Sequence, residues 1–285
     1  MNTAATAPGR PDHSLGRQML NKVPEITLWF WIIKILCTTV GETVSDYLSD
    51  TVGWGLTNTT YVTAAVLIAV LGVQFGLRRY VPLVYWAAVV LISVVGTQIT
   101  DNLVDNHGVP LRTTTIIFSI ALAVTFATWY AVERTLSIHT IVTTRREAFY
   151  WVTILVTFAL GTAAGDYLAE TLAIGYWKSA LLFGAAIAVI AVAHFRLGLN
   201  AVFAFWAAYV LTRPLGASIG DYLSQPTADG GRGWGTTTTS LVFLVTILAV
   251  VVFLTITKRD VTELQDEPKH PARPAREGAP APESP

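Results

Sequence analysis

The amino-acid sequence predicts an all-α, polytopic integral membrane protein with eight transmembrane helices. The first observation is composition: 53% of the 285 residues are hydrophobic and only 13% are charged, whereas soluble domains carry about a quarter charged residues. The second is a mean hydropathy of +0.52. The third is the distribution of apolar residues, which fall into eight long stretches joined by short connections. Together these observations favour a chain that crosses a bilayer several times.

Each of the eight stretches approaches or exceeds the roughly 20 mainly apolar residues that a helix needs to cross about 30 Å of hydrocarbon. They cover residues 25–48, 57–77, 82–104, 112–132, 147–170, 177–195, 201–224 and 237–257. Because the connections are short, neighbouring helices are expected to pack antiparallel. The single cysteine, Cys37, lies within the first stretch, so a disulfide framework within one chain is excluded.

Lysine and arginine are distributed unequally between the two sets of connections. Eleven lie in the tails and connections of one set, and only Arg112, Lys178 and Arg232 lie in the other. Because cytoplasmic segments carry the excess of positive charge, both termini are predicted to be cytoplasmic. The predicted organisation is a polar N-terminal tail (1–21), a first half of four helices (22–133), a cytoplasmic connection (134–146), a second half of four helices (147–257) and a disordered C-terminal tail (258–285).

The chain contains four copies of one motif, and each copy spans two predicted crossings. The aligned stretches are GETVSDYL at 41, GTQITDNL at 96, GTAAGDYL at 161 and GASIGDYL at 216. A tryptophan stands fifteen residues before each aspartate: Trp31, Trp86, Trp151 and Trp206 precede Asp46, Asp101, Asp166 and Asp221. An even number of crossings per copy gives every copy the same orientation, the parallel type of repeat. The aspartate spacings of 55, 65 and 55 residues indicate two similar halves of two repeats each.

Four tandem two-helix repeats, each with one tryptophan, make residues 22–258 similar to a bacterial membrane-protein family. The family is known as a repeat of unknown function, and its members are described as uncharacterised membrane-anchored proteins. The resemblance implies an integral membrane fold, which we expect in the bacterial cytoplasmic (inner) membrane as a multi-pass protein. It implies no activity.

The first predicted helix has one polar face. At about 100° per residue, Trp31, Lys34, Thr38, Glu42 and Asp46 share that face. Because charge facing lipid is costly, the odd-numbered helices are predicted to line the interior and the even-numbered ones to surround them. The four tryptophans are interpreted as interior packing residues, with an interfacial aromatic belt as the alternative.

The glycines of the motif are interpreted as packing residues. Gly161 with Gly165, and Gly216 with Gly220, are GxxxG pairs, while Gly41 and Gly96 each begin a similar pair with a small residue four positions on. Small residues let helix backbones approach closely where lipid supplies no hydrophobic drive between helices. A tight central cluster of helices is therefore expected.

The acidic and basic residues on the interior face allow two interpretations. Asp46, Asp101, Asp166 and Asp221 lie near the outer hydrocarbon boundary, either as an acidic ring on a transport path or as solvated helix ends and partners of neighbouring helix starts. Lys34, Glu42 and Arg213 replace neutral residues of the other copies, and a charge at the centre of a membrane helix costs about 2.5–3.5 kcal/mol. Lys34 and Arg213 are expected to pair with Glu42 or with aspartates of adjacent repeats. Such a pair is either a buried structural ion pair or part of a polar pathway.

The enzymatic motifs are absent from the sequence, which has no HExxH, no GxSxG and no glycine-rich phosphate loop with lysine. The five histidines are scattered without metal-ligand spacing, so we expect no enzymatic activity, no cofactor and no nucleic-acid partner. A carboxylate-only site would favour hard ions such as magnesium, calcium or manganese.

The leading hypothesis is a small secondary transporter or exporter that moves a cation or small solute, with proton coupling, between the odd-numbered helices. The aspartates would form an outer acidic ring, Glu42 would accept a cation or proton, Lys34 and Arg213 would compensate charge, and the tryptophans would wall or plug the path. The alternative is a non-transporting membrane scaffold or regulatory subunit. A third reading is an intramembrane enzyme acting on lipid, for which paired carboxylates are the only acid–base groups. Substrate and oligomeric state stay open.

Overall fold

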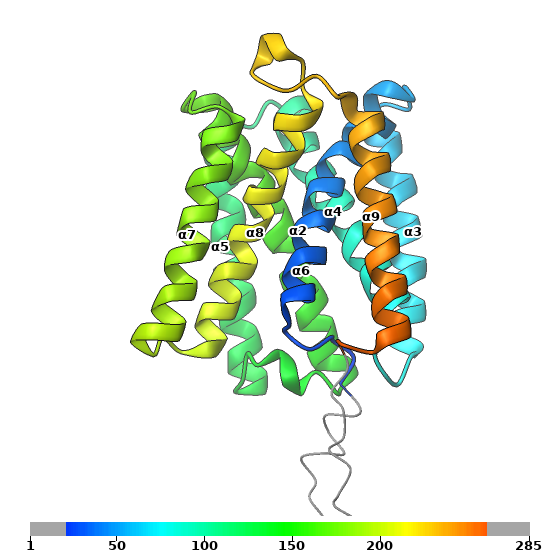
Figure 1. Ribbon diagram of the computed structural model, residues 1–285, viewed down its shortest axis with the longest axis vertical. Coiled ribbons are helices and arrows are strands. Elements are labelled where there is room, and N and C mark those ends of the chain that lie inside the picture. The colour runs from blue at the N-terminus through cyan, green and yellow to red at the C-terminus, as the bar shows by residue number, and fades with distance from the viewer. Residues whose placement is uncertain (1–20, 261–285) are drawn as a thin grey trace, which may run out of the picture.

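The computed structural model describes residues 21–260, and within them eight long helices lie side by side (Figure 1). All eight are long and apolar enough to cross a membrane, and the described part of the chain contains no strand, which confirms the predicted fold class. The helices are α2 (Leu28–Asp46), α3 (Leu56–Gly76), α4 (Pro82–Asp101), α5 (Leu111–Glu133), α6 (Thr144–Asp166), α7 (Tyr176–Leu197), α8 (Ala201–Ser224) and α9 (Gly235–Thr257).

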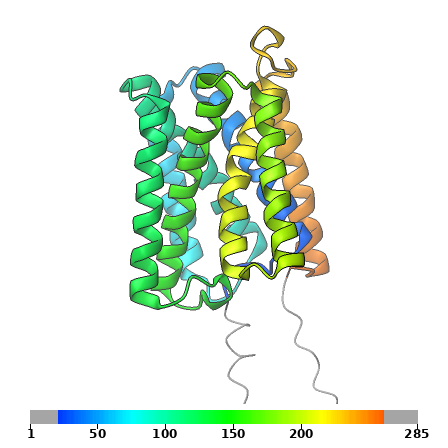
Figure 2. The same ribbon diagram turned by 90° about the vertical axis from the view of Figure 1, so that its left-hand side faces the viewer.

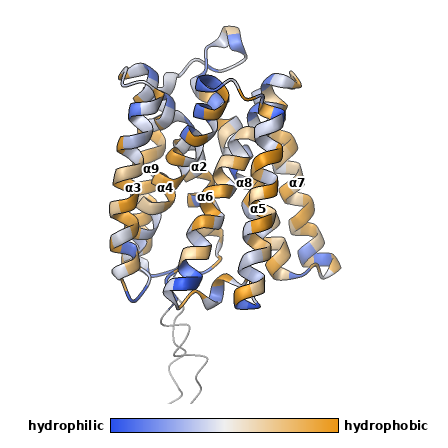
Figure 3. Ribbon diagram, turned by 180° about the vertical axis from the view of Figure 1, so that it is seen from behind, coloured by the Kyte–Doolittle hydropathy of each residue, from blue (hydrophilic) through white to orange (hydrophobic). Residues whose placement is uncertain are grey.

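The helices form an inner and an outer layer. In α2, α4, α6 and α8, 61–67% of the apolar span is buried, compared with 6–28% in α3, α5, α7 and α9. This confirms that the first helix of each repeat lines the interior. The ribbons of the outer helices carry the colour of hydrophobic residues over much of their length (Figure 3), as expected for helices that face lipid.

The four inner helices close into a ring. Helix α2 packs on α4, α4 on α6, α6 on α8, and α8 returns to α2. Each outer helix covers the inner helix of the following repeat, so α3 packs on α4, α5 on α6, α7 on α8, and α9 on α2. The last repeat therefore closes on the first, and the chain has a cyclic, fourfold pseudo-symmetric arrangement.

The motif glycines lie at the contacts that close the ring. Each faces a residue of the next repeat, and a Cβ added there would collide with it: Gly41 with Ser93, Gly96 with Phe158, Gly161 with Arg213, and Gly216 with Thr38. Gly165 and Gly220 lie one turn further along the same faces, against Pro214 and the backbone oxygen of Thr39. Close backbone approach of this kind is what small residues permit between membrane helices.

The motif tryptophans make a second cyclic set of contacts, in the opposite direction. Each packs on an aromatic residue of the preceding repeat: Trp31 on Phe205, Trp86 on Phe30, Trp151 on Tyr85, and Trp206 on Tyr150, with ring centroids 5.4–6.3 Å apart. Trp86, Trp151 and Trp206 are buried, whereas Trp31 is half-buried. The central positions belong to the residue before each tryptophan. These four residues, Phe30, Tyr85, Tyr150 and Phe205, are called the aromatic layer below.

The two ends of the described chain lie on the same side of the bundle, the lower end in Figure 2. This side is called the terminal side, and the opposite one the distal side. Of the predicted C-terminal tail, residues 258–260 are described; the rest of it, and residues 1–20 of the predicted N-terminal tail, lie outside the described residues. The Asp260 backbone oxygen accepts a hydrogen bond from the Glu25 amide, and its carboxylate accepts one from Tyr80. Burial and the neighbouring Asp260 raise the pKa of the Tyr80 phenol, so it remains the donor.

The distal ends of the repeats are alike in three copies and different in the fourth. Helices α2, α4 and α6 each continue into a π-helical turn, at Tyr47–Thr51, Asn102–Asn106 and Tyr167–Thr171. Helix α8 has no such turn, and a longer connection with a 3-10 turn at Thr227–Asp229 follows it. This connection forms the yellow loop that rises above the others in Figure 1. The distal end of the ring is therefore not symmetric.

Candidate functional site

A cavity of about 220 Å³ opens at the distal end of the inner ring. Eight carboxylates line it, with no lysine or arginine among the lining residues: Glu42, Asp46, Asp50, Asp101, Asp105, Asp166, Glu170 and Asp221. The ring brings together the motif aspartates of all four repeats because α2, α4, α6 and α8 end at the same level. We call this space the acidic cavity.

The carboxylates of the acidic cavity are graded in depth. Asp50, Asp105 and Glu170 are exposed at the rim. Asp46, Asp101 and Asp166 are partly buried, while Asp221 and Glu42 are only 7% and 6% exposed. Glu42 thus lies among the deepest of the lining groups.

Arg213 closes the inner end of the acidic cavity. Its Nη2 donates to Glu42 Oε2 at 2.8 Å and to Thr162 Oγ1 at 2.7 Å, and it also contacts the Thr97 hydroxyl. Its Nη1 donates to the backbone oxygen of Thr38 at 2.6 Å. The expected pairing of Arg213 with Glu42 is therefore present, and the guanidinium joins all four inner helices.

The repeat explains how these groups meet. Glu42, Thr97 and Thr162 each lie four residues before the motif aspartate of their copy, and the fourth copy has Ala217 there. Because alanine has no polar group, Arg213, one turn earlier on α8, supplies the fourth polar contact at this level. Glu42, Thr97 and Thr162 thus occupy equivalent positions of the repeat, where the first copy has a carboxylate and the second and third have a hydroxyl.

Lys34 pairs with no carboxylate among residues 21–260, which corrects one of the expected pairings. Its Nζ donates to Thr212 Oγ1 at 3.1 Å and lies 3.9 Å and 4.3 Å from the ring centroids of Tyr209 and Phe158. The side chain is only 1% exposed. Lys34 lies two turns from Glu42 on α2 and Arg213 occupies the acid, so the ammonium group is held by aromatic rings and a hydroxyl instead.

The terminal half of the ring is filled by side chains. In the aromatic layer, the hydroxyls of Tyr85 and Tyr150 form a hydrogen bond, and the Phe30 and Phe205 rings lie 5.9 Å apart. All four residues are buried. The identity of the residue before each tryptophan, aromatic in every copy, is the sequence signal that would have located this layer.

A second buried ion pair lies on the terminal side, and the sequence analysis missed it. Lys22 Nζ lies 2.7 Å from Glu147 Oε2, and Gln74 Nε2 donates to Glu147 Oε1 at 3.2 Å. Lys22 also donates to the backbone oxygen of Phe75. The segment before α2 is thereby fixed to α3 and α6. Gln74, a polar residue within the otherwise apolar helix α3, is the sequence feature that could have indicated a buried polar contact here.

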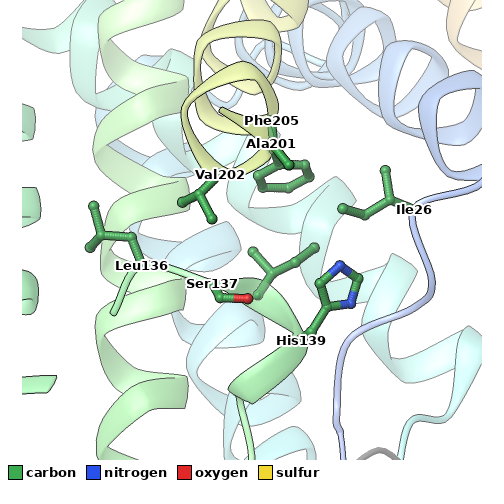
Figure 4. Close-up of a pocket in the computed structure, with 8 residues that line it drawn as sticks. Ile26, Leu136, Ser137, His139, Ala201, Val202 and Phe205 are labelled. Carbon is green, nitrogen blue, oxygen red and sulfur yellow. The ribbon is translucent and has the colours of Figure 1, made fainter. Parts of the chain in front are cut away.

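Two further hollows have different linings. One, of about 60 Å³, lies on the terminal side between the 136–139 connection and the start of α8; His139 is its one imidazole, among mainly apolar side chains (Figure 4). The other, of about 360 Å³, is an apolar groove between α4 and α9. Neither is lined by an acidic residue, so the acidic cavity is the candidate site.

Four tandem two-helix units closed into a ring define a multi-pass helical membrane protein of repeat type. The chain belongs to the family described as Repeat of Unknown Function (DUF347), whose model matches residues 29–80, 84–135, 149–199 and 204–260. Each match covers one inner helix and the outer helix that follows it, which confirms the four predicted repeats. No curated protein and no solved structure matches the chain.

Proposed function

We propose that this protein is a small secondary transporter or exporter that moves a cation across the bacterial cytoplasmic membrane in exchange for protons. The observation that carries the proposal is an acid-lined cavity that enters the ring from one side and reaches Glu42. Glu42 precedes Asp50 by eight residues on the same helical segment, or roughly 12 Å at about 1.5 Å per residue. The cavity therefore extends well into the membrane span.

The difference between the distal and the terminal half of the ring supports a carrier. The distal half has a cavity, whereas the terminal half is filled by Arg213, Lys34 and the aromatic layer. By the distribution of lysine and arginine, the cavity faces the outside and the filled half faces the cytoplasm. Access from one side at a time, with repeats that move against one another, is how secondary transporters operate.

The residues have distinct roles under this proposal. The acidic cavity concentrates cations through its field, Glu42 accepts a cation or a proton, and Arg213 compensates part of the negative charge at Glu42. Lys34 supplies fixed positive charge below the site. The aromatic layer and the tryptophans packed on it form the cytoplasmic barrier, which has to open for the cation to pass between Glu42 and the cytoplasm.

The test is flux in vesicles reconstituted with the full-length protein. An imposed proton gradient is expected to drive uptake of a cation, reported together with internal pH, and Glu42→Gln is expected to abolish both signals. Asp229→Asn is the matched control, because Asp229 is an exposed acid of the distal connection that does not line the cavity. Unchanged flux in a folded Glu42→Gln protein would remove Glu42 from the mechanism.

The filled terminal half favours a second candidate, a membrane scaffold or regulatory subunit without flux of its own. Buried ion pairs and close glycine contacts suit a rigid centre that does not open. The single cysteine, Cys37, is buried in α2 between Lys34 and Glu42. A scaffold would keep Cys37 unreactive to thiol reagents under every gradient, whereas a carrier would expose it during turnover.

A further inference from the structure

Three carboxylates of the acidic cavity converge on one point. One oxygen each from Glu42, Asp166 and Asp221 can be chosen so that all three lie within 4.8 Å of one another. The residues come from α2, α6 and α8, so the ring closure brings them together. The other five lining acids do not belong to this group.

Asp221 gives an independent indication that a ligand belongs here. Its side chain is only 7% exposed and lines the cavity, and within residues 21–260 no hydrogen bond or ion pair engages its carboxylate. Burying a carboxylate without a partner is costly. Its counterparts in the other repeats, Asp46, Asp101 and Asp166, are by contrast only partly buried.

Glu42 is positioned to share its two oxygens between two partners. Arg213 and Thr97 both donate to Oε2, and no described residue donates to Oε1. The hydrogen bonds to Oε2 fix the carboxylate, and fixed ligands of this kind are typical of metal sites, where outer partners orient the ligand. Oε1 is therefore available to a ligand in the acidic cavity.

We propose that Glu42, Asp166 and Asp221 bind one hard divalent cation; this deepens the proposed function by naming its substrate class and rests on it for that role. Calcium takes oxygen ligands at about 2.3–2.6 Å, so one such ion contacts oxygens that lie up to roughly 5 Å apart. Three carboxylates against the single guanidinium of Arg213 leave two negative charges, which one divalent cation neutralises. Water supplies the remaining ligands of a six- to eight-coordinate ion.

The experiment is calorimetric titration of the purified full-length protein in lipid nanodiscs with calcium chloride and with manganese chloride, with potassium chloride as the monovalent comparison. One saturable divalent site per chain is expected, with no saturable binding of potassium. Asp221→Asn and Asp166→Asn are expected to weaken it about 10–100-fold or more, the loss seen when even outer partners of a metal are removed. Asp229→Asn should bind as the wild type does.

Asp50→Asn separates coordination from diffuse attraction, because Asp50 lines the same cavity at its exposed rim. A local site predicts a much smaller loss in Asp50→Asn than in Asp221→Asn, and equal losses would overturn the proposal. Absence of saturable binding of either divalent ion would overturn it as well. Flux is scored separately: binding without flux would end the transport role alone, and flux without binding would end the divalent site alone.

Discussion

Arg213 on α8 donates a 2.8 Å hydrogen bond to Glu42 on α2, joining two residues that are 171 positions apart in the chain. The guanidinium is fully buried and the carboxylate nearly so. This pair separates the acidic cavity from the filled half of the ring. It also fastens the fourth repeat to the first, where the ring closes.

The Glu42–Arg213 pair should show strong coupling in unfolding experiments. Arg213→Met leaves Glu42 buried without its partner and is expected to cost about 3–5 kcal/mol in the free energy of unfolding. Adding Glu42→Gln removes the uncompensated charge and should recover part of that loss. Unfolding in detergent, followed by tryptophan fluorescence, measures the cycle; strictly additive effects of the two changes would contradict the coupling.

Lys34 should behave differently from Arg213 because no carboxylate depends on it. Lys34→Met replaces the ammonium with an apolar side chain of similar length among Tyr209, Phe158 and Thr212. Replacing a buried charge by a packed apolar group is often neutral or stabilising, so the midpoint of thermal unfolding should stay the same or rise. The same variant should lose flux if Lys34 serves transport. A large drop in thermal stability would show that Lys34 holds the fold.

The contact between Gly216 and Thr38 should limit substitution at the point of ring closure. A Cβ on Gly216 would collide with the Thr38 side chain, and Gly216→Ala is expected to destabilise the protein by about 1–3 kcal/mol through overpacking. Gly72→Ala is the control, since nothing lies within 4 Å of a Cβ there. Alanine favours helix over glycine by up to about 1 kcal/mol, so the control should be neutral or more stable.

Opening of the terminal half should be visible at Cys37. In the structure this thiol is fully buried, so a maleimide should label the wild type slowly without a gradient. Tyr85→Phe combined with Tyr150→Phe removes both hydroxyls of one hydrogen bond, which costs little stability but weakens the barrier. Faster labelling from the terminal side is then expected. Arg79→Cys, in the exposed terminal-side connection between α3 and α4, provides the exposed reference thiol, and Cys37→Ser provides the blank.

The Lys22–Glu147 pair should matter far more than the contact between Glu133 and the exposed Arg145 close to it. Glu147→Gln leaves the buried Lys22 ammonium unpaired and is expected to cost about 3–5 kcal/mol. Arg145→Gln removes an exposed partner of Glu133, which keeps its other partner Arg146, so little change is expected. Thermal unfolding of both variants makes the comparison, and equal effects would contradict the importance assigned to burial.

The fold could be predicted from the sequence because its signals are local. Eight apolar stretches of spanning length and four copies of one motif, anchored by Trp31 and Asp46 and their counterparts, do not depend on how the helices meet. The polar face of the first helix likewise indicated which helices are inside. The candidate site was predicted less completely. The motif aspartates were identified, but not that Asp221 would be buried with no hydrogen-bond or ion-pair partner among the described residues, or that Lys34 would lie among aromatic rings.

The sequence by itself determined the membrane helices, their fourfold repetition and the face that each inner helix turns inward, since helix periodicity fixes which residues share a face. Only the tertiary structure decided which faces meet. Ring closure brings α8 against α2, and this contact pairs Arg213 with Glu42, while Lys34 has no acidic partner in the described part of the chain. The four copies carry different residues at the level of Glu42, and the same closure places these different residues against one another at the centre of the ring.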